Sequence, residues 1–142
     1  MRSGLSSITI PASVEVIGSF VFSSCTGLTT VNWNATACRR RRSNTDSIFS
    51  GCTNLVSLNI GKNVTNIPAS AFATCRGLAS VTIPDNVTSI GDYAFLDCTE
   101  LTSITYESTK AQWNAISKGS SWDYNVPSSC KVYCADGTVT IK

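Results

Sequence analysis

A phrase of 23 residues recurs along this chain of 142 residues, and no other feature constrains the fold as strongly. Three of the four steps between its leading leucines are 23 residues long and one is 27; the leucines are Leu5, Leu28, Leu55, Leu78 and Leu101. A unit of this length cannot bury its own apolar side chains and must stack on its neighbours. The repetition therefore predicts a solenoid in which equivalent residues of successive coils lie side by side.

Each copy opens with alternating apolar and polar residues, as in Ser80-Val81-Thr82-Ile83-Pro84. A period of two predicts a short strand with one buried face, and proline ends it because proline has no amide hydrogen for a ladder. Later in each copy, a phenylalanine and a cysteine lie three residues apart, which predicts one side of a short helical turn. These pairs are Phe22 and Cys25, Phe49 and Cys52, Phe72 and Cys75, and Phe95 and Cys98.

Other residues of the copies carry predictions about where these helical turns begin and end. We expect Asp92 to cap the start of one turn. We expect a left-handed backbone at the residue that follows each turn, where Gly27, Asn54 and Gly77 stand.

The string Leu-x-Ser-Ile/Val-Thr-Ile-Pro-x-x-Val-x-x-Ile-Gly-x-x-Ala-Phe-x-x-Cys resembles the BspA-like, or treponemal-type, leucine-rich repeat family, and residues 78–100 match it at nearly every defining position. The resemblance implies an α/β solenoid: a right-handed array of about four to five coils with a parallel β-sheet on one face, short helical turns on the other, and a C-terminal cap. We predict repeats near 5–27, 28–54, 55–77 and 78–100, a last strand at 101–107, and hence a solenoid over 1–107 and a capping segment over 108–142.

The two ends of the chain carry separate predictions. The tail resembles the segments that follow such arrays through Lys110-Ala111-Gln112-Trp113 and Cys134-Ala135-Asp136-Gly137. Its large apolar residues should cover the open end of the core; they are Trp113, Ile116, Trp122, Tyr124, Val132 and Tyr133. At the other end, Met1 to Gly4 lead directly into a repeat strand, which predicts either a longer parent protein or self-association through an uncapped N-terminal coil.

Seven cysteines invite a disulfide or metal interpretation. The four repeat cysteines should form a column of buried thiols, because parallel side chains on coils about 4.8 Å apart do not converge as a disulfide requires. Cys130 and Cys134 are the candidate disulfide, and Cys38 is left over. Histidine is absent and no pair of Cys-x-x-Cys motifs exists, so we predict neither a metal site nor a cofactor.

Catalysis and nucleic-acid binding are not predicted. Without histidine, the Ser-His-Asp and Cys-His arrangements are excluded, and no glycine-rich phosphate loop is present. The net charge is only +2, although Arg39, Arg40, Arg41 and Arg42 are consecutive. We interpret this cluster as a solvated loop, with a basic binding patch as the alternative. No apolar stretch is long enough for a transmembrane helix, so no membrane insertion is expected.

The polar residues of the predicted strands should point outward in two files: Ser7, Thr9, Thr30, Asn32, Ser57, Asn59, Ser80, Thr82, Ser103 and Thr105. Such a face commonly holds partners in solenoids, although Ser and Thr also simply suit exposed strands. The resemblance implies a non-catalytic protein-binding domain of a bacterial cell-surface or secreted adhesin that binds host or neighbouring-cell proteins. The alternatives are a structural spacer or self-assembling module without a ligand, and an ice-facing surface, which Asn32 and Asn59 would interrupt.

Overall fold

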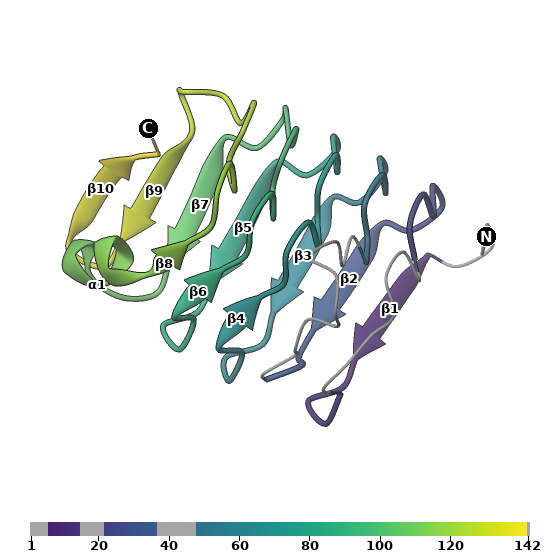
Figure 1. Ribbon diagram of the computed structural model, residues 1–142, viewed down its shortest axis with the longest axis horizontal. Coiled ribbons are helices and arrows are strands. Elements are labelled where there is room, and N and C mark those ends of the chain that lie inside the picture. The colour runs from purple at the N-terminus through teal and green to yellow at the C-terminus, as the bar shows by residue number, and fades with distance from the viewer. Residues whose placement is uncertain (1–5, 15–21, 37–47, 142) are drawn as a thin grey trace.

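A seven-stranded sheet runs along one side of the molecule in a computed structural model that describes residues 6–14, 22–36 and 48–141 (Figure 1). Its strands, in spatial order, are β1 (Ser7–Ile10), β2 (Thr30–Trp33), β3 (Ser57–Ile60), β5 (Ser80–Ile83), β7 (Ser103–Tyr106), β9 (Lys131–Cys134) and β10 (Gly137–Thr140). All neighbours pair in parallel except β9 and β10, which are antiparallel. The predicted stacking of repeat strands into one parallel sheet is confirmed.

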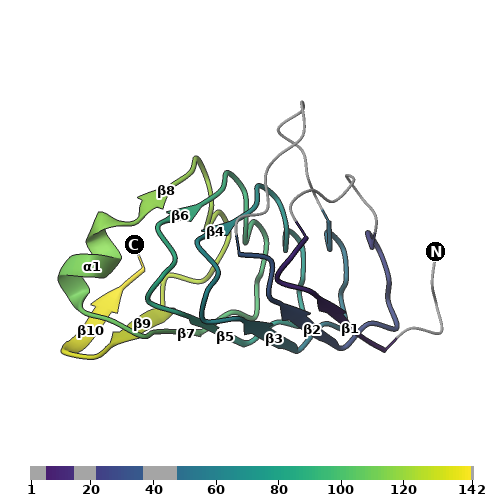
Figure 2. The ribbon, with the colours of Figure 1, turned by 90° about the horizontal axis from the view of Figure 1, so that it is seen from below.

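A second, smaller sheet lies on another side of the coils (Figure 2). It is parallel and contains β4 (Asn66–Ile67), β6 (Ser89–Ile90) and β8 (Ser117–Lys118). The repeat positions leading into it hold apolar residues, and Val64, Ile67, Val87 and Ile90 are all buried. The coils that begin with β3, β5 and β7 therefore each contribute one strand to the large sheet and a short strand to the small one, and the core lies between the two sheets.

The turns that carry the phenylalanine and cysteine differ from the prediction, because they are not helices in the described coils. The amide of Cys75 does donate to the carbonyl of Phe72 at 3.3 Å, as a tight turn requires. The amides of Phe72 and Thr74, however, donate to Ala94 and Leu96 of the next coil at 3.0 and 2.6 Å. Amides directed at a neighbouring coil are not available for an α-helix, so the stack replaces the local helix.

The left-handed residues also lie elsewhere than predicted. Gly27, Asn54 and Gly77 do not have a positive φ; instead, the residue before each cysteine does, namely Ser24, Gly51, Thr74 and Asp97, with φ of 58°, 79°, 56° and 60°. Asp92 does not cap a local helix: its Oδ1 accepts from the Ser120 amide of the next coil at 2.8 Å. Both features serve contacts between coils, which no single copy of the repeat reveals.

Phenylalanines of successive coils form a continuous column in the core. The ring centroids of Phe22 and Phe49 are 5.4 Å apart, those of Phe49 and Phe72 are 5.5 Å apart, and those of Phe72 and Phe95 are 5.8 Å apart, with nearly parallel planes. Trp33 packs edge-on against Phe49 and Phe72 from the sheet side. Its indole Nε1 is buried without a hydrogen-bond partner among the described residues, a cost of placing tryptophan where other coils have isoleucine or tyrosine.

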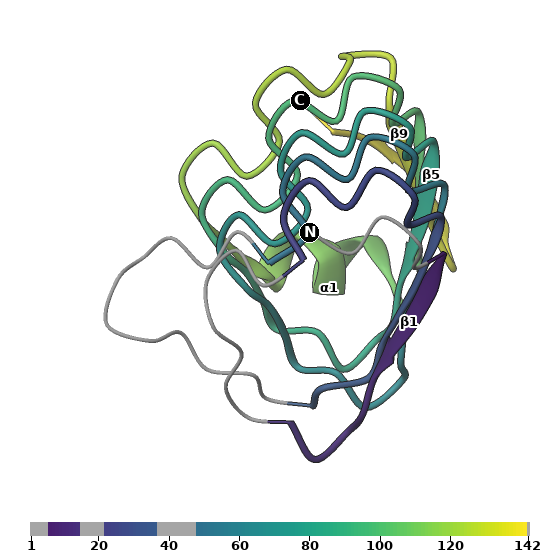
Figure 3. The same ribbon diagram turned by 90° about the vertical axis from the view of Figure 1, so that its right-hand side faces the viewer.

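The residues after β7 add a further layer to the core. Trp113, Ile116, Trp122 and Val132 are buried as predicted, whereas Tyr124 and Tyr133 are 56% and 46% exposed and do not cover it. Strands β8 and β9 extend both sheets, and helix α1 (Lys110–Ala115) lies within the outline of the coils in the view along the solenoid (Figure 3). The division of the chain at residue 107 stays a prediction.

Two tail motifs meet at the start of α1. The Lys110 amide donates to Asp136 Oδ1 at 2.8 Å, and the Thr109 hydroxyl accepts from the Gln112 amide at 3.2 Å. At the other end, Lys118 Nζ donates to the Trp113 and Ile116 carbonyls at 2.6 and 3.3 Å. Lys118 pairs in register with Ile90, which in turn pairs with Ile67, so a lysine occupies the last position of this isoleucine column. Burial lowers the pKa of the Lys118 amine.

We expect the Phe72→Ala substitution to lower the free energy of unfolding by about 3–5 kcal/mol, because it opens a cavity in the middle of the aromatic column. The control Val56→Ala removes an apolar side chain that is 58% exposed, and should change stability by less than about 0.5 kcal/mol. Urea denaturation followed by circular dichroism measures both. Similar losses for the two variants would contradict a core organised around this column.

Hydrogen exchange should locate one weak joint in the large sheet. The Ser57 amide donates to Thr29 at 3.1 Å, but no equivalent bond joins Ser80 to Val56, although both residues are described. We therefore expect the Ser80 amide to exchange about tenfold or more faster than the Ser57 amide. Residue-resolved exchange followed by NMR compares two serines at the same repeat position, and equal protection would contradict the open joint.

Candidate functional site

The outward surface of the large sheet, here called the strand face, is the most extended candidate site. The structure brings all ten predicted residues together on it, each exposed or half-exposed. They form two files: one contains Ser7, Thr30, Ser57, Ser80 and Ser103, and the other contains Thr9, Asn32, Asn59, Thr82 and Thr105. Neighbours within each file are paired in register, except Ser57 and Ser80. The predicted geometry is present, and the binding role of these residues stays a prediction.

Hydrogen bonds between side chains order the N-terminal half of the second file. Asn59 Nδ2 donates to Asn32 Oδ1 at 2.8 Å, and Asn32 Nδ2 donates to Thr9 Oγ1 at 3.2 Å. Each amide is held by the coil before it, so the surface is preorganised and loses little side-chain entropy when a partner binds.

The joint between β3 and β5 forms a shallow hollow in the strand face. Only Asn59 and Thr82 pair there, whereas β2 and β3 pair at four positions. One reason is Pro84, which has no amide hydrogen to offer, although the equivalent residues Gly61 and Glu107 both donate to the preceding coil. The hollow measures about 130 Å³ and exposes almost only polar groups. It has room for a few water molecules or one small side chain, but is smaller than a typical metabolite site.

Strand β9 adds two residues to the strand face that the sequence reasoning missed. Lys131 pairs with Ser103 and Tyr133 with Thr105, so both extend the files, and both side chains are exposed. The run Lys131 to Cys134 does alternate polar and apolar residues, with Val132 fully buried, and this pattern could have identified a further strand. Tyr133, which is expected from the sequence to cover the core, therefore lies on the outer face of the sheet.

The cysteine column lies on the opposite side, inside the convex turns. Cys52, Cys75 and Cys98 are fully buried free thiols, as predicted, and each Sγ donates to a phenylalanine carbonyl of the preceding coil at 3.2–3.3 Å. Burial raises the pKa of the Cys52 thiol to about 11 and of the Cys98 thiol to about 12, and raises that of Cys75 well above its ordinary value. These thiols are protonated structural groups and not nucleophiles.

The predicted disulfide between Cys130 and Cys134 is not formed in the structure, where Cys134 is a free thiol. Cys134 ends strand β9 and Cys130 directly precedes it. Four residues of extended chain separate their Cα atoms by about 13 Å, whereas a disulfide spans about 4.4–6.8 Å. The short sequence separation suggested a bridge, but the extended backbone prevents it.

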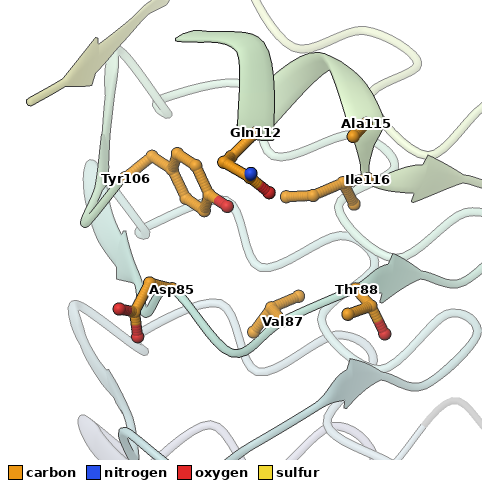
Figure 4. A pocket seen from close by; sticks show the side chains of 7 residues that line it. All are labelled: Asp85, Val87, Thr88, Tyr106, Gln112, Ala115 and Ile116. Carbon is orange, nitrogen blue, oxygen red and sulfur yellow. The ribbon is translucent and has the colours of Figure 1, made fainter. Parts of the chain in front are cut away.

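A second small pocket lies between α1 and the coils (Figure 4). Tyr106, Gln112 and Ile116 line one side of it, and Asp85 and Val87 line the other. Burial raises the pKa of the Tyr106 hydroxyl, and the Asp85 charge adds to this. The pocket measures about 90 Å³, too little for a metabolite, and we interpret it as a packing defect where the helix meets the last repeat.

Other predicted features give no site. Cys38 and the basic cluster Arg39 to Arg42 lie outside the described residues. Among residues 6–14, 22–36 and 48–141, no group of three or more cysteine, aspartate or glutamate side chains is placed to hold a metal ion. In the same part of the chain, no helix has the length and apolar character needed to cross a bilayer.

Comparisons with known proteins agree with the stacked architecture. The sequence profile of the family described as BspA type leucine-rich repeat region matches residues 1–118 in six copies. A solved leucine-rich cell surface protein from Faecalibacterium prausnitzii A2-165 is 32% identical over 78% of this chain, with a TM-score of 0.56. A leucine-rich repeat protein from Bacteroides ovatus ATCC 8483 is 22% identical over 91% of this chain, with a TM-score of 0.59, and supports the fold alone.

The chain spans 34% of the length of the first of these proteins and 42% of the second. No curated protein matches the chain.

The cysteine column predicts a loss of stability at alkaline pH. Thiols of the unfolded chain ionise near pH 9, whereas the native Cys98 thiol ionises near 12, so its contribution is complete below pH 9 and is lost as pH rises toward 12. We expect Cys98→Ala to make the fall of unfolding free energy with pH less steep, by about 1 kcal/mol per pH unit above about pH 9. Urea denaturation between pH 8 and pH 10.5 measures this slope, and parallel curves for variant and parent would contradict it.

Proposed function

The chain belongs to the BspA-type leucine-rich repeat family, and on this premise we propose that it is a protein-binding domain of a bacterial cell-surface or secreted adhesin. The strand face is the proposed binding surface, and its partners are proteins of a host or of neighbouring cells. Families of this repeat type are generally non-catalytic, and the proposal involves no reaction and no cofactor.

One observation carries the proposal: ten small hydrogen-bonding side chains are held in two rows on a parallel sheet. Exposed hydrogen-bond donors and acceptors at fixed spacing suit a surface that binds another protein, because few of these side chains lose conformational freedom on binding. Surface localisation is supported by the Faecalibacterium prausnitzii protein, which is described as a cell surface protein and is 32% identical.

We expect bulky charged substitutions on the strand face to abolish cell binding without unfolding the protein. Thr82→Arg introduces a long side chain in the middle of the second file, where its neighbours Asn59 and Thr105 are also exposed. Flow cytometry measures how fluorescently labelled protein binds to cultured epithelial cells and to bacterial cells, and circular dichroism verifies folding. Binding by the parent protein should fall after the cells are treated with protease, because the partner is a protein.

Asn63→Arg is the matched control, since Asn63 is exposed but lies in the loop after β3 rather than in either file. It should bind cells as the parent protein does. Equal loss for both arginine variants, or binding by neither the parent nor the variants, would favour a structural spacer over an adhesin.

A further inference from the structure

The C-terminal end of the strand face differs in chemistry from the rest. Tyr133 is 46% exposed on β9, between the exposed hydroxyl-bearing residues Thr105 on β7 and Thr138 on β10. Lys131, two residues earlier on the same strand, is also exposed. The remaining file positions hold only serine, threonine and asparagine, so Lys131 is the one charged side chain within the files.

Tyr133 does not contribute to the core from this position. The inner side of β9 is formed by Val132, which is fully buried, while the tyrosine ring stands on the outer side. Tyrosine presents a large contact area with only two side-chain torsions to order, and it is enriched among the residues that carry binding energy in protein interfaces. A flat surface of small hydroxyl groups without such an anchor would bind weakly.

The spacing of the two side chains defines what they can hold. Lys131 and Tyr133 project from the same side of one strand, about 6.6 Å apart along it. The same distance separates side chains i and i+2 of an extended polypeptide. An extended segment lying along β9 can therefore place a carboxylate against Lys131 and an aromatic or aliphatic side chain against Tyr133 at the same time.

Given the strand-face function proposed above, we propose that the partner docks at its C-terminal end through an extended acidic segment, with Tyr133 as packing anchor and Lys131 as carboxylate partner. Charge complementarity favours an acidic partner, because the only charged side chain within the files is the positively charged Lys131. The hydroxyls of Thr105 and Thr138 flank the anchor and bond to polar groups of the segment. The recognised pattern is Asp or Glu two positions from an aromatic or aliphatic residue, in either chain direction.

Selection from a random 12-residue peptide library displayed on phage tests this proposal with the purified full chain. We expect enriched peptides to carry the acidic and apolar pair at i and i+2. For a selected synthetic peptide, Tyr133→Ala should weaken the affinity measured by fluorescence anisotropy about 30-fold, as is typical for an interface anchor. Lys131→Ala should weaken it less and reduce its dependence on salt, because the lost contact is electrostatic.

The chain offers matched controls for both residues. Tyr124 is 56% exposed but lies on the convex turns, where its carbonyl accepts from the Asp97 amide, so Tyr124→Ala should leave the affinity unchanged. Lys62 is exposed in the loop after β3, and Lys62→Ala should likewise have no effect. A repeat selection with Lys131→Glu should enrich basic peptides instead of acidic ones.

Other outcomes separate this proposal from the strand-face function. Peptides that lose binding with Thr30→Arg but not with Tyr133→Ala would leave the strand face as the binding surface and overturn the C-terminal anchor. Peptides indifferent to every strand-face variant would contradict both. If no peptide is enriched, or if the enriched peptides lack acidic residues, the proposal of an extended acidic segment is wrong. The cell-binding assay tests the strand-face function separately.

Discussion

Backbone hydrogen bonds between successive coils are the interaction on which the rest of this structure depends. They run along the large sheet, through the small sheet and across the convex turns, where Phe72 and Thr74 donate to Ala94 and Leu96. Because every coil is bonded to the next at several places around its circumference, equivalent residues are forced into columns. A slip of one residue would reverse the two faces of a strand, so the repeat length is under strong constraint.

The columns explain both the core and the candidate site. Inside, the phenylalanine rings stack at 5.4–5.8 Å, and the cysteine thiols donate to carbonyls of the preceding coil. Outside, the same register turns isolated serines, threonines and asparagines into two ordered rows. The asparagine bonds from Asn59 to Asn32 and from Asn32 to Thr9 show how a surface group is fixed by the coil beside it. Recognition chemistry on this face is therefore a product of the stacking.

Residues that repeat could be predicted well from the sequence, and residues that depend on a partner coil could not. The strand positions and the column of buried thiols were both predicted, because a period of two or a recurring residue reports directly on burial. The convex turns were predicted as helices, since a spacing of three between Phe72 and Cys75 fits a helix and a tight turn equally. Only the neighbouring coil, which takes up the amides, distinguishes the two.

The sequence by itself determined that the chain stacks into columns and which side of each strand is buried, because these depend only on the repeat length and on hydrophobic alternation. The tertiary structure alone decided how the tail after β7 is joined to the coils. It places Lys131 and Tyr133 in register with Ser103 and Thr105, joins Lys110 to Asp136, and keeps Cys130 and Cys134 too far apart to bridge. The first two of these contacts join residues 26 to 28 positions apart, in segments that share no recurring motif. The pairing of the strands therefore determines these contacts, and the local sequence does not.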